Sequence, residues 1–200
     1  AEAAADFDLI SITGHKLGGP VGTGALFVRS GITLDPLLLG GGQERGRRAG
    51  TPDVAGACAL AAAIGVTIER RAEEIVRLGG LRDELVAGLR SALGDHVTTT
   101  VLGGGAPVAA GIAHVCFPAV EAEALLFLLD QEGLRASAAS SCSSGAQDPS
   151  HVLAAMGVPR EIAQGSLRLS LGHTTTQADI DSALAIIAPA VERLSDHGGG

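Results

Sequence analysis

The sequence contains no asparagine, tryptophan or tyrosine, and it contains a single lysine, Lys16. Without asparagine, the chain has no N-glycosylation sequence. All the other residues in the count of lysines and arginines are arginines. Arginine stays protonated and cannot act as an amine nucleophile, whereas lysine can lose its proton and form a Schiff base. Lys16 is therefore a candidate for a position where the chemistry requires an amine, and the alternative is a surface lysine in a loop.

The chain also lacks the features of a membrane or nucleic-acid-binding protein. The longest apolar run, at 54–66, is too short and too rich in alanine and glycine to span a bilayer. Residues 1–10 carry acidic side chains instead of the basic start of a signal peptide. The formal net charge of −8 disfavours a nucleic-acid surface, which would be basic. With 46% hydrophobic residues, the 200-residue composition fits a soluble α/β protein without membrane or nucleic-acid partners.

Three cysteines are present, and no two of them form a C-x-x-C motif. An odd number disfavours a disulfide framework and fits the reducing cytoplasm, which is the location we predict. Cys58 and Cys116 lie in apolar runs, which predicts buried and unreactive thiols. Cys142 lies among serines and a glycine, so we expect an accessible thiol that can ionise and attack sulfur. The alternative for Cys142 is an incidental cysteine in a loop.

Strand and helix patterns alternate along the chain, which predicts an α/β fold. The predicted elements are strands at 7–12, 24–29, 96–102, 111–117, 134–138 and 165–172 and helices at 53–93, 121–133, 150–157 and 176–194. The apolar composition predicts that the strand at 7–12 and the Ala-rich start of the first helix are buried. Because a domain rarely opens on a core strand, we expect this chain to be the C-terminal part of a longer protein.

The first predicted helix contains the boundary between two predicted domains. Thr51 followed by Pro52 is typical of a helix start, and Gly79–Gly80 predicts a bend or break. We therefore divide the chain into domains at 1–78 and 79–195. Residues 196–200 form a Gly-rich tail that we expect to be disordered.

Three segments resemble the cysteine desulfurases of the NifS/IscS type, which are class V aminotransferase enzymes that use pyridoxal phosphate (PLP). They are DLISITGHKLGGPVGTGALFVR, GGGQERGRRAGTPDVAG, and SSCSSGAQDPSHVLAAMG with the following GSLRLSLGHTTTQADID. They occur in the family's order and cover nearly the whole chain. The resemblance implies the end of the large PLP-binding domain of a fold type I transferase. A small C-terminal α/β sandwich domain, which carries a mobile cysteine loop, would follow.

The resemblance also assigns cofactor contacts to the first two segments. Lys16 would hold PLP covalently and later move the Cα proton of the substrate. Thr13, Gly14 and His15 would contact the phosphate, with Thr13 where the family usually has serine. Thr51 would reach the PLP phosphate of the other subunit, which implies a homodimer.

The third segment would carry the substrate chemistry. Cys142 would take sulfur from L-cysteine as a persulfide and release L-alanine, and Arg168 would hold the substrate carboxylate. The sulfur would pass to an iron–sulfur scaffold or another acceptor protein, for iron–sulfur cluster assembly or tRNA thiolation. The sequence contains no metal-ligand spacing, although Cys142 can share a transient iron–sulfur cluster.

Several other polar residues are weaker candidates. We expect His151 at a helix start and His114 partly buried in a strand, while His173 stands where the family often has arginine. The cluster Arg45, Arg47 and Arg48 is either a solvated face or, as the family resemblance implies, a contact near the active site and dimer interface.

Two alternatives to a desulfurase remain open at this point. One is a PLP-dependent aminotransferase or selenocysteine lyase of the same fold, and the other is a non-catalytic partner-binding fragment. The residues that would stack on the PLP ring and pair with its nitrogen are absent from these 200 residues. The chain alone should therefore bind PLP weakly and turn over poorly.

Overall fold

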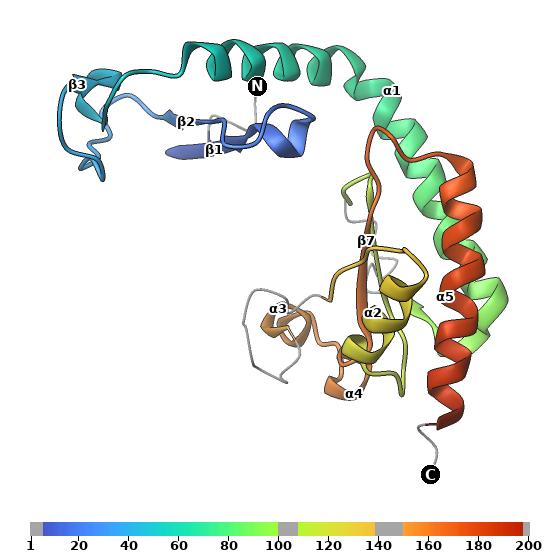
Figure 1. Ribbon diagram of the computed structural model, residues 1–200. Coiled ribbons are helices and arrows are strands. Elements are labelled where there is room, and N and C mark those ends of the chain that lie inside the picture. Colours follow the sequence, from blue (N-terminus) through green and yellow to red (C-terminus); the bar gives the residue numbers. More distant parts are fainter. Residues whose placement is uncertain (1–5, 100–107, 139–149, 198–200) are drawn as a thin grey trace. The chain divides into compact units, whose positions relative to one another are not determined.

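The computed structural model describes residues 6–99, 108–138 and 150–197 (Figure 1). Clustering of contacts divides the chain into two compact units, one ending at Arg71 and one starting at Ala72. Both units include part of helix α1 (Val54–Leu93). The boundary predicted at residue 78 also falls within this helix, and the assignment of two domains stays a prediction.

The first unit is built around an antiparallel hairpin of β1 (Leu9–Thr13) and β2 (Gly24–Val28). A second, smaller hairpin pairs β3 (Gly42–Gln43) with β4 (Arg48–Ala49). The prediction that the first strand is buried is wrong, because Leu9 is 44% exposed on one face of the hairpin and Phe27 is 55% exposed on the other. Within the described residues the hairpin is a two-stranded sheet, and Ile10 and Ile12 of β1 are no more than half-buried.

Helix α1 runs for 40 residues without the predicted break at Gly79–Gly80. A methyl group at either glycine would meet nothing within 4 Å, so neither glycine is required by close packing. The flanking residues are good helix formers and carry the helix through the pair. The helix begins at Val54, and the Asp53 carboxylate accepts a hydrogen bond from the Gly56 amide at 2.9 Å. Asp53 therefore caps this end, where the sequence predicts Thr51. The predicted burial of its first part holds for Leu60, which is buried, but is wrong for Val54 and Val66, which are exposed.

The second unit contains a three-stranded antiparallel sheet in the order β5 (Thr98–Thr99), β6 (Ile112–Cys116), β7 (Ser166–Ser170). The strands predicted at 111–117 and 165–172 are confirmed. The strand predicted at 134–138 reduces to an isolated bridge between Ser137 and Arg168. The helices of this unit are α2 (Ala122–Gln131), α3 (His151–Ala155), α4 (Arg160–Ala163) and α5 (Gln177–His197).

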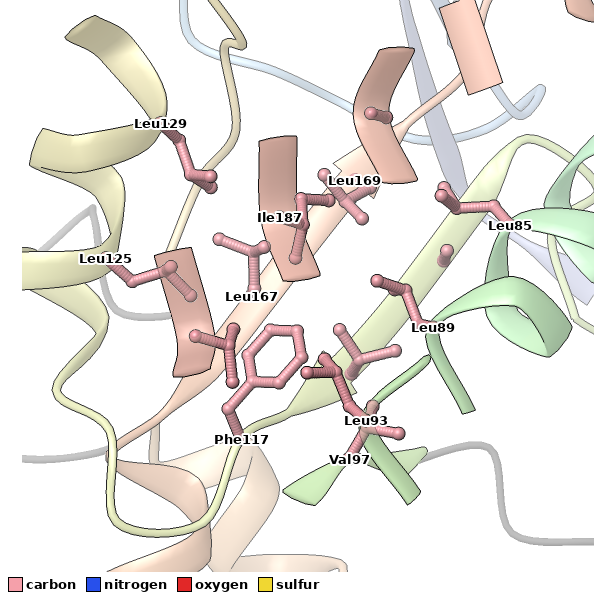
Figure 2. Packing of buried hydrophobic residues seen from close by; sticks show 14 of the residues in the cluster. Leu85, Leu89, Leu93, Val97, Phe117, Leu125, Leu129, Leu167, Leu169 and Ile187 are labelled. Carbon is pink, nitrogen blue, oxygen red and sulfur yellow. The ribbon is translucent and has the colours of Figure 1, made fainter. Parts of the chain in front are cut away.

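One hydrophobic core holds the second unit together (Figure 2). Alternate residues of the sheet point into it, including Val115, Leu167 and Leu169, because successive strand side chains face opposite sides. Helices α1, α2 and α5 supply the other side of the core. At Gly88 of α1, a methyl group would lie 2.6 Å from the nearest Leu184 side-chain atom, so glycine lets α5 pack closely there.

Candidate functional site

Lys16 lies on a tight turn that directly follows β1. The turn is a 3-10 helix, η2 (Gly14–Leu17), which ends at Gly18 in the left-handed conformation with φ 77°. Glycine adopts this conformation at little cost. The Lys16 side chain is exposed, and it makes no hydrogen bond or ion pair within residues 6–99, 108–138 and 150–197. Its amine is therefore accessible to a ligand.

The Lys16 turn is fixed by the chain that leads into β2. The Gly14 amide donates to the Thr23 carbonyl at 2.8 Å, and the Gly19 amide donates to the Gly14 carbonyl at 2.9 Å. A methyl group at Gly14 would overlap Thr23 Oγ1 and lie 3.0 Å from the Pro20 carbonyl oxygen. A larger residue would have to displace Thr23, so glycine favours the close packing of the backbone before Lys16.

The groups around Lys16 fit PLP by the chemistry of their donors. Thr13 Oγ1 lies 2.9 Å from Nδ1 of His15, two residues along the chain. A hydroxyl that accepts from the imidazole can still donate its own proton to a phosphate oxygen. The turn thus combines one exposed amine with a Thr13–His15 pair that, with a neutral imidazole, has one donor for an anion: the Thr13 hydroxyl or the Nε2–H of His15.

The loop before Thr51 adopts unusual backbone conformations. Glu44 and Arg45 have φ values of 48° and 57°, in the left-handed region that non-glycine residues rarely adopt. Arg47 donates to the Ile32 carbonyl at 3.4 Å, which ties the loop back to the unit. Thr51 itself is exposed, three residues before α1. Its predicted contact with a second subunit stays a prediction.

Arg168 lies at the centre of β7, on the sheet face opposite the core. Its neighbours along the strand, Leu167 and Leu169, are buried in the core, whereas Arg168 is exposed. His114 stands opposite it on β6. Burial, and secondly the charge of Arg168, lower the pKa of His114, so this partly buried imidazole is neutral at pH 7. An exposed guanidinium beside a neutral group can accept a carboxylate as its partner.

The three cysteines have different settings. Cys142 lies outside the described residues, so its predicted role stays a prediction. Cys116 is fully buried, and burial raises its pKa to about 11, which agrees with an unreactive thiol. The prediction for Cys58 is wrong, because this residue of α1 is exposed. It lies in the part of α1 that belongs to the first unit.

The remaining candidates stay outside any ligand cluster. His151 is the first residue of α3, where the Ser150 hydroxyl accepts from the Val152 amide at 3.2 Å. His173 is exposed. Within the described part of the chain, no three His, Cys, Asp or Glu side chains gather as metal ligands do. Every helix in the described residues is too short or too polar to span a bilayer.

Two contacts that hold the Arg168 region were not predicted from the sequence. Ser137 pairs with Arg168 through the isolated bridge. The strand predicted at 134–138 includes Ser137, and this was the sequence signal that could have suggested the pairing. Arg77 of α1 donates to the carbonyls of Thr175 at 2.6 Å and Gly172 at 3.3 Å, which fixes the loop after β7. Its partner Glu74, at 2.8 Å, is three residues away on the same helix, a spacing that places the two side chains together.

Known proteins resemble this chain over nearly its whole length. A model of the aminotransferase class-V family matches residues 3–183. An IscS-like cysteine desulfurase of Mycobacterium tuberculosis (strain ATCC 25618 / H37Rv) is 47% identical over 191 residues, covering 95% of this chain and 48% of that protein. Cysteine desulfurase IscS of Methanosarcina thermophila is 43% identical over 193 residues, covering 94% of this chain and 46% of that protein. A solved NifS-like protein aligns with TM-score 0.80 at 32% identity, covering 94% of this chain and 47% of that one.

The chain spans about half the length of the curated relatives that it matches. The relatives' names do not favour the aminotransferase, the selenocysteine lyase or the non-catalytic fragment. The resemblance of the three sequence segments is confirmed. The chain belongs to the aminotransferase class-V family and is similar to the cysteine desulfurases within it.

Proposed function

We propose that this chain forms part of a PLP-dependent cysteine desulfurase, which converts L-cysteine to L-alanine and leaves a persulfide on Cys142. The observation that carries the proposal is the placement of Lys16. The only lysine of the chain lies exposed on a turn of fixed backbone, directly after a strand. The similarity to named cysteine desulfurases supports the choice of substrate.

The Lys16 turn would hold the cofactor. Bound PLP would supply an electron sink for the negative charge that develops at the substrate Cα. The Lys16 amine would bind it covalently and, when the substrate amine replaces it, would carry the Cα proton. Thr13 and His15 would contact its phosphate, one of them as the hydrogen-bond donor.

The second unit would act on the substrate. Arg168 would orient the substrate through its carboxylate, for which a planar guanidinium is suited. The thiolate of Cys142 would form an S–S bond with the substrate sulfur while the Cβ–S bond of the substrate breaks. The electron pair of that bond stays with Cβ, and proton uptake there completes L-alanine. An acceptor protein would then take the sulfur for iron–sulfur cluster assembly or tRNA thiolation.

The proposed enzyme is a homodimer in which Thr51 contacts the PLP phosphate of the other subunit. Exposed apolar residues before Thr51 support an interface there, because Leu37 is 98% exposed and Leu39 is 84% exposed. Sedimentation analysis of the complete enzyme tests this point. A Leu39→Glu variant should sediment as a monomer, and a wild-type monomer would contradict it.

The rest of the PLP site would come from polypeptide outside these 200 residues. A chimaera can supply the missing part of the site: the N-terminal half of the protein from Mycobacterium tuberculosis is fused to the N-terminus of this chain. The 200-residue chain alone serves as the comparison. With PLP and L-cysteine, the chimaera should turn yellow, form alanine and gain one sulfur atom on Cys142 by mass spectrometry. Cys142→Ala should abolish the added sulfur and the alanine, whereas Cys58→Ala should retain both.

Lys16→Arg keeps the positive charge at this position but removes the amine that can bind PLP covalently. The variant should keep the circular dichroism spectrum of the parent chimaera and lose the yellow absorbance. Two results would overturn the proposed function: a wild-type chimaera that stays colourless with PLP, or alanine formation that continues unchanged in Cys142→Ala.

A further inference from the structure

Arg168 is bracketed by the backbone of Ser137. The Arg168 amide donates to the Ser137 carbonyl at 2.7 Å, and the Ser137 amide donates to the Arg168 carbonyl at 3.2 Å. This pair of bonds places Ser137 beside Arg168 on the edge of β7, while His114 of β6 stands on the other side. The three residues thus form one row across the sheet.

The side chains of this bracket also meet. Nη2 of Arg168 donates to Ser137 Oγ at 3.4 Å, and the Ser137 hydroxyl donates in turn to the Ala138 carbonyl at 3.2 Å. The donor of Ser137 is thereby directed to the backbone, which leaves its oxygen as an acceptor for the guanidinium. Within the described residues, no carboxylate forms an ion pair with Arg168. The guanidinium is therefore oriented by a neutral hydroxyl without being neutralised.

We propose that Ser137 is a positioning residue, whose hydroxyl aims the Arg168 guanidinium at the carboxylate of the substrate. The assignment rests on the proposed function for the identity of that substrate. An exposed arginine side chain samples many rotamers, and fixing it when an anion binds costs conformational entropy. A hydrogen bond that already holds one guanidinium nitrogen lowers this cost. A neutral acceptor suits this role, because a carboxylate at the same place would compete with the substrate.

Ser137→Ala tests the hydroxyl alone, because alanine can still form both backbone hydrogen bonds with Arg168. Ser137→Thr retains a hydroxyl, and Ser170→Ala removes a hydroxyl two residues from Arg168 on the same strand. In the ¹⁵N-labelled 200-residue chain, Arg168→Lys identifies the Nε–Hε signal of Arg168. We expect Ser137→Ala to lower the order parameter of that signal to below about 0.6, the flexible range. Ser137→Thr and Ser170→Ala should leave it near the wild-type value.

Kinetics of the chimaera supply the second readout. Ser137→Ala should raise KM for L-cysteine by about tenfold with kcat within about twofold, as expected when binding is weakened equally in ground and transition states. Ser137→Thr should restore KM. An unchanged Arg168 order parameter in Ser137→Ala, or an equal loss in Ser170→Ala, overturns the positioning role. A wild-type chimaera that forms no alanine overturns the proposed function instead, and the order parameters still decide whether Ser137 holds Arg168.

Discussion

The exposure of Cys58 and the burial of Cys116 predict that an alkylating reagent modifies Cys58 of the folded chain and leaves Cys116 unmodified. Cys116 is 0% exposed, and burial raises its pKa from 9.0 to about 11. Because each pKa unit is a factor of ten, its thiolate fraction at pH 8 is about 0.1%, against roughly 9% for a thiol at the ordinary value. This shift alone slows alkylation by about 100-fold, since the thiolate is the nucleophile. Exclusion of the reagent by the core slows it further.

The assay is time-resolved labelling with iodoacetamide at pH 8, followed by peptide mass spectrometry. Cys58, which is exposed, should label fully, while Cys116 stays more than about 95% unmodified because little of it is thiolate and the core excludes the reagent. Labelling in urea is the control, because both thiols should then react at similar rates. If Cys116 reacts within tenfold of Cys58 in the folded chain, the burial argument is refuted. Such a result would also weaken the case that Cys142 alone receives sulfur.

Three further predictions concern the two units separately. Gly14→Ala should disorder the turn of the first unit through the overlap described above and speed limited proteolysis there, whereas Gly41→Ala, with nothing within 4 Å, should not. Phe117→Ala should lower the free energy of unfolding by about 3–5 kcal/mol in urea titrations, because Phe117 is 0% exposed, while Phe127→Ala at 65% exposed should cost less than about 0.5 kcal/mol. Hydrogen bonds from Thr176 lower the pKa of Asp179, so its carboxylate stabilises the start of α5 above pH 3.8, and this contribution is lost as the pH falls further. Asp179→Asn should therefore lower the urea midpoint at pH 7 and approach the wild type at pH 3.

The sequence alone was enough to predict the strands and helices that a local pattern of apolar residues marks. The alternation at 165–172 requires only that every second side chain be apolar, and β7 forms there with Leu167 and Leu169 in the core. The resemblance to desulfurases also needed no structure, because its motifs lie in continuous segments. Lys16 stood out through composition alone, since it is the only lysine in the chain.

The tertiary structure decided what depends on neighbours distant in sequence. Burial of the strand at 7–12 could not be judged from its apolar residues, because burial depends on what covers a strand in the folded chain, and Leu9 is 44% exposed. Gly79–Gly80 stayed helical because the continuous helix on both sides outweighed the propensity of two glycines. Likewise, Ser137 and Arg168 are 31 residues apart, and only the folding of the sheet edge brings the hydroxyl to the guanidinium.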